Sequence, residues 1–257
     1  MSIATVGDNL IHYEVLGRGE PVIFVHGWLG SWRYWWPSMQ ALSARHRTFA
    51  FDFWGFGDSS KYSEKYAFDA YVEMLGDFID KLGIFKPVTL VGHALGGAVA
   101  LRYTVQNPDR VQRVASVAVP LVGDAVNERL TTWDSSSVLS RVVGASYPEV
   151  DMELRKTDNV AMNSTARDVI QENFIQDALT CPRPFLMIFG DQDPLVKQMT
   201  DRLVDTPDSV AYVSLECNHF PMLEQAMKFN RLVLDFTHSD GNLQAIAPKD
   251  HWQRRNR

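Results

Sequence analysis

Residues 88–98 read Val-Thr-Leu-Val-Gly-His-Ala-Leu-Gly-Gly-Ala, and this segment carries the strongest indication of the fold. A short apolar run is followed by a glycine-flanked turn and then by small residues that suit the start of a helix. The layout matches the G-x-S-x-G pattern of a nucleophile elbow, a tight turn between a strand and a helix. Gly92 and Gly96 lack Cβ atoms, which lets strand and helix close around the central residue. That residue is Ala94, so the turn is present without a nucleophilic side chain.

Short strands and helices alternate along most of the chain. Residues 22–25 and 184–189 are continuous apolar runs, typical of strands that are buried on both faces of a parallel sheet. The pattern also predicts a hairpin at 3–16, strands at 48–51, 88–91, 111–119 and 211–215, helices at 37–45, 68–82 and 221–236, and a loop and helix at 193–204. This alternation predicts an α/β fold, with a mostly parallel, doubly wound sheet and helices on both faces.

The alternation stops between residues 121 and 180. This segment contains no strong strand pattern and is too long for a plain loop, so we expect it to form a helical cap. The predicted organisation is therefore a core made of residues 1–120 and 181–237 with a cap at 121–180. The polar tail at 238–257 is interpreted as a C-terminal extension.

Three groups of polar residues directly follow predicted strands, which is where ligands bind in open α/β sheets. They are the turn at residues 26–28, Asp193 and His219. Serine hydrolysis needs a nucleophile, a histidine base, a carboxylate that orients the histidine, and N–H donors for the oxyanion. The order of nucleophile position, acid and histidine along this chain is the order found in α/β-hydrolases.

The sequence resembles the α/β-hydrolase superfamily, in its capped, cofactor-free branch of small esterases, C–C bond hydrolases and haloperoxidase-like proteins. The resemblance covers nearly the whole chain outside the cap and the tail. It rests on His26-Gly27-Trp28, residues 52–59, residues 92–97, Gly190-x-x-Asp193 and His219-Phe220-Pro221.

The resemblance implies a role for each matching residue. Asp193 would be the acid and His219 the base, and the backbone N–H groups of Trp28 and Leu95 would form the oxyanion hole. Hydrolytic members carry serine, cysteine or aspartate where this chain has Ala94, and the surrounding glycines are typical of the serine branch. The implied chemistry is hydrolysis of a carboxylic ester, thioester or lactone through an acyl-enzyme, without a cofactor. C–C bond hydrolysis and peroxide-dependent chemistry use the same residues and stay open.

Several neighbouring residues have alternative interpretations. Asp191 is a rival for the acid, although the spacing in the family favours the aspartate two residues later. His26 and His93 flank the site and are interpreted as structural hydrogen-bonding groups. Asp52 and Asp58 are expected to organise a loop. Apolar side chains near the site predict a largely apolar substrate pocket that contains Leu121, Val122, Trp133, Leu195 and Phe220.

Alanine at position 94 allows two interpretations. In the first, an active hydrolase has lost its serine by replacement, and the chain binds substrate without turning it over. In the second, Ala94 is native, and the protein is a small-molecule receptor built on a hydrolase frame. The first is favoured because the acid and the histidine are both retained.

Composition limits the classes of partner. The net charge of −6 argues against nucleic acid and against an anionic membrane as partners. No apolar run approaches a membrane span of about 20 residues, and the first residues lack the pattern of a signal peptide. Two cysteines, not in metal-ligand spacing, indicate neither a metal site nor a disulfide framework. We therefore expect a cytoplasmic protein with a small-molecule substrate and no metal or cofactor, and a homodimer stays an open alternative.

Overall fold

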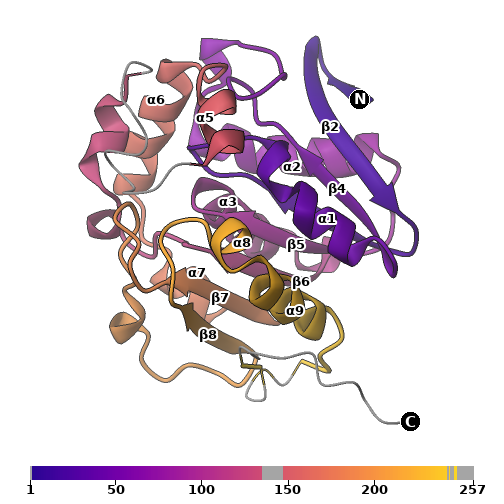
Figure 1. Cartoon of the computed structure of the whole chain (residues 1–257), viewed down its shortest axis with the longest axis vertical. Coiled ribbons are helices and arrows are strands. Elements are labelled where there is room, and N and C mark those ends of the chain that lie inside the picture. The colour runs from indigo at the N-terminus through magenta and orange to yellow at the C-terminus, as the bar shows by residue number, and fades with distance from the viewer. Residues whose placement is uncertain (1, 135–146, 242, 244–245, 248–257) are drawn as a thin grey trace.

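The computed structural model describes residues 2–134, 147–241, 243, 246 and 247. Residues 135–146 of the expected cap and 248–257 of the expected extension lie outside the described part. The described residues form one eight-stranded sheet in the order β1-β2-β4-β3-β5-β6-β7-β8 (Figure 1). The strands are β1 (Ser2–Val6), β2 (Asn9–Gly17), β3 (Glu20–Val25), β4 (His46–Phe51), β5 (Val88–His93), β6 (Val111–Val117), β7 (Phe185–Gly190) and β8 (Val210–Leu215).

The sheet is mostly parallel. Strands β1, β2 and β4 pair in antiparallel fashion, and all other neighbouring pairs are parallel. The expected hairpin is confirmed, because Val6 of β1 pairs with Asn9 of β2 across the turn. Every residue of the central strand β5 is buried, as its continuous apolar run predicts. The predicted α/β-hydrolase fold, a mostly parallel sheet with helices, is confirmed.

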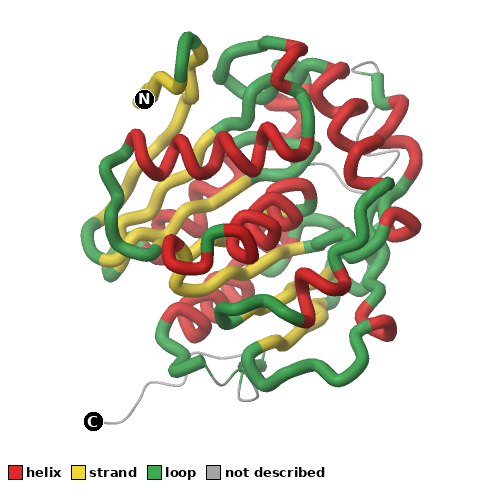
Figure 2. The backbone as a smooth tube through the Cα atoms, turned by 180° about the vertical axis from the view of Figure 1, so that it is seen from behind, coloured by secondary structure: helices red, strands yellow, loops and turns green. Residues whose placement is uncertain are grey.

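Helices cover both faces of the sheet. One face carries α1 (Trp36–Leu42) and α9 (Ala226–Thr237), which pack on each other in front of the strands in Figure 1. The opposite face, turned to the viewer in Figure 2, carries α2 (Phe68–Lys81) and α3 (Leu95–Gln106). Both α2 and α9 bury an apolar stripe and expose a polar one. None of the described helices has the length and apolar character needed to cross a bilayer.

The regular elements described between β6 and β7 are short α- and 3-10 helices, joined by non-helical segments that include isolated β-bridges at Val122 and Val126. The helices are η4 (Gly123–Ala125), η5 (Glu128–Thr132), α5 (Pro148–Leu154), α6 (Asn159–Ile170) and α7 (Ile175–Leu179). Helix α5 packs on η1 (Trp32–Trp35), the 3-10 helix that follows β3, and α6 packs on η5 and on α2 and α3 (Figure 1). These helices therefore lie beside the carboxyl ends of the parallel strands.

Four predicted elements differ from the structure. The helix expected at 37–45 is α1, which ends at Leu42. The strand expected at 111–119 ends at Val117, because Ala118 has a φ of 49°. The helix expected within 193–204 is only a 3-10 turn, η6 (Thr200–Arg202). The preceding residues are extended instead, because Lys197 and Leu195 exchange backbone hydrogen bonds with the 125–127 segment. The helix expected at 221–236 is divided into α8 (Pro221–Glu224) and α9, since Gln225 between them has non-helical dihedral angles.

Candidate active site

The turn between β5 and α3 holds residue 94 in a strained conformation. Ala94 has φ 47° and ψ −111°, a combination that residues other than glycine rarely adopt. Its N–H donates to the carbonyl of Val117 at 2.8 Å, and its carbonyl accepts from the N–H of Ala98 at 3.0 Å. The backbone of residue 94 is thus fixed on both sides, by the neighbouring strand and by the first turn of the helix. This is the geometry that the elbow pattern predicts.

The flanking glycines are required by close backbone contacts. A Cβ on Gly92 would lie 2.2 Å from the carbonyl oxygen of Gly96. A Cβ on Gly96 would lie 2.4 Å from the carbonyl oxygens of both Val25 and His26. Separations under 3.0 Å are not found around real Cβ atoms, so neither position accepts a side chain without a shift of the main chain. The glycines therefore bring the elbow and the end of β3 together.

The turn after β3 lies directly against residue 94. A Cβ on Gly27 would be 3.0 Å from the Cβ of Ala94 and 2.9 Å from the carbonyl oxygen of His93. Trp28, a candidate oxyanion donor, is the next residue along this turn. Leu95, the other candidate, is the first residue of α3, and the N–H groups in the first turn of a helix have no intrahelical partner. Both candidates therefore sit where they flank position 94.

Asp193 and His219 meet across the ends of β7 and β8. The Nδ1 atom of His219 lies 2.8 Å from Oδ2 of Asp193, and their side chains are only 2% and 3% exposed. The other carboxylate oxygen, Oδ1, accepts the N–H groups of Leu195 and Val196 at 2.8 and 3.1 Å. The rival carboxylate, Asp191, is exposed. Asp193 therefore has the position and partners of a residue that orients a histidine.

His26 and His93 use both ring nitrogens in hydrogen bonds with the protein. In His26, Nδ1 lies 2.8 Å from the carbonyl oxygen of Gly27, and Nε2 accepts the N–H of Phe53 at 2.9 Å. In His93, Nδ1 lies 3.0 Å from the hydroxyl of Tyr34, and Nε2 lies 2.8 Å from the carbonyl oxygen of His219. Burial lowers the pKa of both imidazoles. These contacts agree with the interpretation of both residues as structural.

Two side chains that touch the site, Tyr34 and Thr165, have no signal in the sequence. Tyr34 accepts the N–H of Gly27 at 2.7 Å, and it lies inside an aromatic run whose composition indicates only packing. Thr165 of α6 accepts the indole N–H of Trp28 at 3.0 Å across 137 residues. No local pattern links either of these pairs, so only the fold reveals them.

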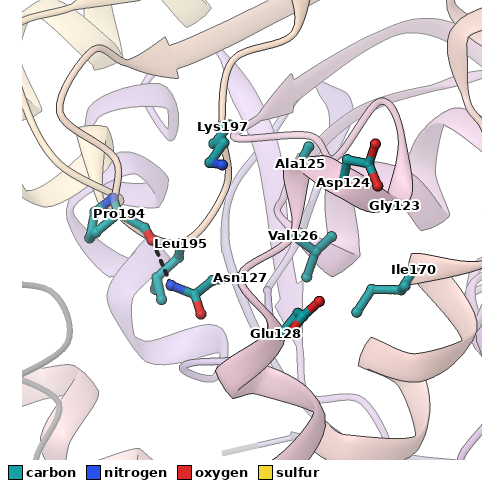
Figure 3. Close-up of a pocket in the computed structure, with 10 residues that line it drawn as sticks. All are labelled: Gly123, Asp124, Ala125, Val126, Asn127, Glu128, Ile170, Pro194, Leu195 and Lys197. Carbon is teal, nitrogen blue, oxygen red and sulfur yellow. Dashed lines mark hydrogen bonds between the residues drawn. The ribbon is translucent and has the colours of Figure 1, made fainter.

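The predicted pocket residues Leu121, Val122, Trp133, Leu195 and Phe220 are all buried. Leu195 lines a cavity of about 410 Å³ between the loop after β7, the η4 segment and the end of α6 (Figure 3). Leu121, Val122, Trp133 and Phe220 are not among its lining residues. The Phe220 ring instead packs against the rings of His93, His219 and Tyr147 at 4.9–5.3 Å.

Asp52 organises the loop that follows β4, as expected. Its Oδ1 accepts the N–H of Trp32 at 2.8 Å, and its Oδ2 accepts the N–H of Asp58 at 3.0 Å. The Nδ1 atom of His12 lies 3.0 Å from the same Oδ2. His12, Asp52 and Asp58 are close enough for a shared metal ion, but the ammonium of Lys156 lies 3.0 Å from Asp58 and opposes a second cation. The carboxylate of Asp52 is already satisfied by protein donors.

The fold and these contacts define a hydrolase-type α/β protein. The chain belongs to the α/β-hydrolase family, because residues 20–150, about half of its length, match the model of the alpha/beta hydrolase fold.

Individual relatives are more distant. The chain is 27% identical to the 2-hydroxy-6-oxo-6-(2'-aminophenyl)hexa-2,4-dienoic acid hydrolase of Metapseudomonas resinovorans, over 87% of this chain and 86% of that protein. The fold of the present chain is similar to that of the enol-lactonase from Burkholderia xenovorans. The TM-score is 0.81, and the identity is 21% over 93% of this chain and all of the other. The fold is also similar to that of a serine-to-alanine variant of CumD, a meta-cleavage product hydrolase from Pseudomonas fluorescens (TM-score 0.76, 24% identity, 92% and 97% coverage).

Proposed function

We propose that this chain is a serine-type hydrolase frame for a carboxylic ester, thioester or lactone, in which Ala94 stands at the nucleophile position. The observation that carries the proposal is the buried His219–Asp193 pair, with the carboxylate also held by two N–H groups. A buried carboxylate and imidazole destabilise a fold unless their partners are complete. The elbow at residue 94 retains a strained backbone that serves to present a side chain at the carboxyl edge of the sheet.

The proposed mechanism follows from the roles of these groups. A serine hydroxyl at position 94 would attack the substrate carbonyl while Nε2 of His219 accepts its proton. Asp193 would keep Nδ1 protonated and stabilise the imidazolium that forms. The N–H groups of Trp28 and Leu95 would bind the oxyanion, and His219 would then protonate the leaving group. In a second step, His219 would take a proton from water, whose oxygen would attack the acyl carbon. The bond between the acyl carbon and the serine oxygen would then break, and His219 would return the proton to that oxygen as the acid leaves.

Ala94 removes the first step and leaves the other parts in place. A methyl group can neither attack a carbonyl nor donate a proton, and loss of a serine nucleophile lowers kcat on the order of a million-fold in a serine protease. The chain as written is therefore proposed to bind a substrate without forming an acyl-enzyme.

The helices between β6 and β7 are proposed to act as the cap of this site, within the predicted range 121–180. The segment is tied to the acid loop by backbone hydrogen bonds from Asn127 to Leu195 and from Lys197 to Ala125, both 2.8 Å long. It is tied to the turn at residues 26–28 by the bond from the Trp28 indole to Thr165. A cap held at these two points would cover the catalytic groups and exclude water from the substrate.

The second candidate function is a small-molecule receptor in which Ala94 is native. The specific observation in its favour is Ala94 itself, because every other part of a binding site can remain without the nucleophile. C–C bond hydrolysis is a further outcome of the first proposal, because the names of two relatives, at 27% and 26% identity, specify hydrolases of dienoic acids.

Turnover by the Ala94→Ser variant tests the proposal. The variant is assayed with activated esters of increasing acyl length, with thioesters, lactones and vinylogous 1,5-diketones as further arms. Turnover that requires the serine supports the hydrolase proposal. A folded but silent variant, together with a ligand that raises the Tm of the chain as written, would favour the receptor instead.

A further inference from the structure

A continuous hydrogen-bond chain joins three separate parts of the site. The N–H of Gly27 donates to the hydroxyl of Tyr34 at 2.7 Å, and that hydroxyl lies 3.0 Å from Nδ1 of His93. The Nε2 atom of His93 lies 2.8 Å from the carbonyl oxygen of His219. Tyr34 and His93 are 1% and 0% exposed, so solvent does not compete for these bonds. These hydrogen bonds thus link the turn at residues 26–28, here called the oxyanion turn, to His93 within the elbow and to the main chain of His219, the candidate base.

Only one placement of the protons satisfies all four groups. The carbonyl of His219 has no proton, so Nε2 of His93 must carry one and donate it. In a neutral imidazole, Nδ1 is then an acceptor and receives the hydroxyl proton of Tyr34. The hydroxyl oxygen stays free to accept the N–H of Gly27. Burial, together with the nearby His219, lowers the pKa of His93 well below its usual value and keeps this ring neutral.

This arrangement holds His219 at two points. Its side chain is oriented by Asp193 through Nδ1, and its main chain is held by His93 through the carbonyl oxygen. His93 also precedes residue 94 directly, so its ring links the elbow to the histidine loop. The rings of Trp35 and Phe220 enclose Tyr34, with centroids 5.1 and 5.9 Å away, and leave its hydroxyl little freedom.

We propose that Tyr34 is a positioning residue. Through His93, it holds the oxyanion turn and the main chain of His219 in fixed positions relative to residue 94. The inference rests on the proposed function and adds to it a residue outside the catalytic groups. In the proposed mechanism, Tyr34 touches neither a reacting atom nor the substrate. Its effect is on the placement of the groups that do, and displacement of a reacting group by about 1 Å can lower a rate by about 100-fold.

The test is Tyr34→Phe in the Ala94→Ser background. This change keeps the ring but leaves the N–H of Gly27 and Nδ1 of His93 without a partner. The matched control is Tyr71→Phe, because Tyr71 is equally buried and its hydroxyl donates to the backbone carbonyl of Trp54 at 2.5 Å, a bond that includes none of the candidate catalytic groups. We expect Tyr34→Phe to lower kcat by about 10- to 100-fold with little change in KM, and Tyr71→Phe to leave kcat within about twofold. Equal losses in both variants would overturn the proposal, because they would indicate general destabilisation.

A second readout needs no turnover and keeps the two proposals separate. In the chain as written, NMR of the imidazole nitrogens reports the tautomer of His93 and the Nδ1–H proton shared by His219 and Asp193. Tyr34→Phe is expected to shift the His93 Nδ1 resonance and to shift or broaden the His219 Nδ1–H signal, whereas Tyr71→Phe leaves both in place. Unchanged signals in Tyr34→Phe would overturn the positioning role. If these signals shift but the Ala94→Ser variant shows no turnover, the positioning role of Tyr34 is supported and the hydrolase proposal fails.

Discussion

The Nδ1 atom of His219 lies 2.8 Å from Oδ2 of Asp193, although 26 residues separate them along the chain. Both side chains are almost fully buried. The other carboxylate oxygen of Asp193, Oδ1, accepts two further hydrogen bonds, from the N–H groups of Leu195 and Val196. Such a pair contributes little to stability compared with apolar side chains of similar volume. Its presence beside the elbow of Ala94 is therefore better explained by chemistry at this site than by the needs of the fold.

Asp193→Asn in the Ala94→Ser background should lower kcat by about 10⁴-fold. The amide oxygen would be taken by the N–H groups of Leu195 and Val196, which now bind Oδ1, and the amide NH₂ would then face His219 and favour the wrong tautomer. Steady-state kinetics near neutral pH measures the loss. Asp191→Asn is the matched control, because Asp191 is exposed and two residues away. A larger loss from the control would assign the acid to Asp191.

Thr165→Val should weaken both the fold and the site. The hydroxyl of Thr165 accepts the Trp28 indole N–H and donates to the carbonyl of Ala161, so valine leaves a buried indole N–H unpaired. We expect a loss of about 1–3 kcal/mol in the free energy of unfolding and a lower kcat/KM in the Ala94→Ser background.

Thr104→Val is the control for this prediction. Thr104 is equally buried and bonds the carbonyl four residues earlier in its helix at 2.7 Å, as Thr165 does, but its hydroxyl receives no indole N–H. Its variant should lose less stability and no activity. Urea unfolding and steady-state kinetics compare the two, and equal effects would remove the special role of the Trp28 contact.

Gly96→Ala should be strongly destabilising. The new methyl group would lie 2.4 Å from two backbone carbonyl oxygens, which cannot move without separating β3 from the elbow. A loss near the upper end of about 1–3 kcal/mol is expected from such overpacking. Gly76→Ala in α2 would meet only the edge of the Tyr103 ring at 3.0 Å, so its effect should stay within about 1 kcal/mol. Comparable melting temperatures for the two variants would contradict the close packing at the elbow.

The contact between His12 and Asp52 should make part of the stability depend on pH. Burial alone would lower the pKa of His12, but the hydrogen bond and the charge of Asp52, with smaller contributions from Asp58 and Glu14, raise it above 6.5. A raised folded-state pKa stabilises the protein fully below the unfolded pKa, and this contribution is lost as pH rises through the folded pKa. His12→Gln should therefore lose more stability at about pH 5.5 than at about pH 9 by urea unfolding. An equal loss at both pH values would show that the raised pKa makes no contribution.

The parts of the fold that follow from local patterns were predictable from the sequence. The apolar run of β5 and its glycines indicate both the strand and the elbow, and the structure shows residue 94 in the expected strained turn. The sequence predicts Asp193 and His219 as candidates because both follow apolar strands, in the order that the family uses. Their contact is then a consequence of the parallel pairing of β7 with β8.

Long-range contacts account for what the sequence did not reveal. The bond from Trp28 to Thr165 and the bonds around Tyr34 join residues that no periodicity relates. The segment at 195–197 has no strand pattern of its own, and it is extended because a distant segment, 125–127, pairs with it. In both cases the tertiary fold brings the two segments together, so the local sequence of either segment does not identify its partner.

Covalent labelling by a fluorophosphonate tests whether position 94 is a nucleophile position, and it needs no knowledge of the natural substrate. An activated serine oxygen displaces fluoride from phosphorus while a histidine takes the proton, and intact mass spectrometry detects the adduct. We predict rapid labelling of Ala94→Ser, none of the chain as written, and strongly slowed labelling of the double variant Ala94→Ser/His219→Ala. A folded Ala94→Ser variant that stays unlabelled like the chain as written would contradict the account of position 94 as a nucleophile position served by His219.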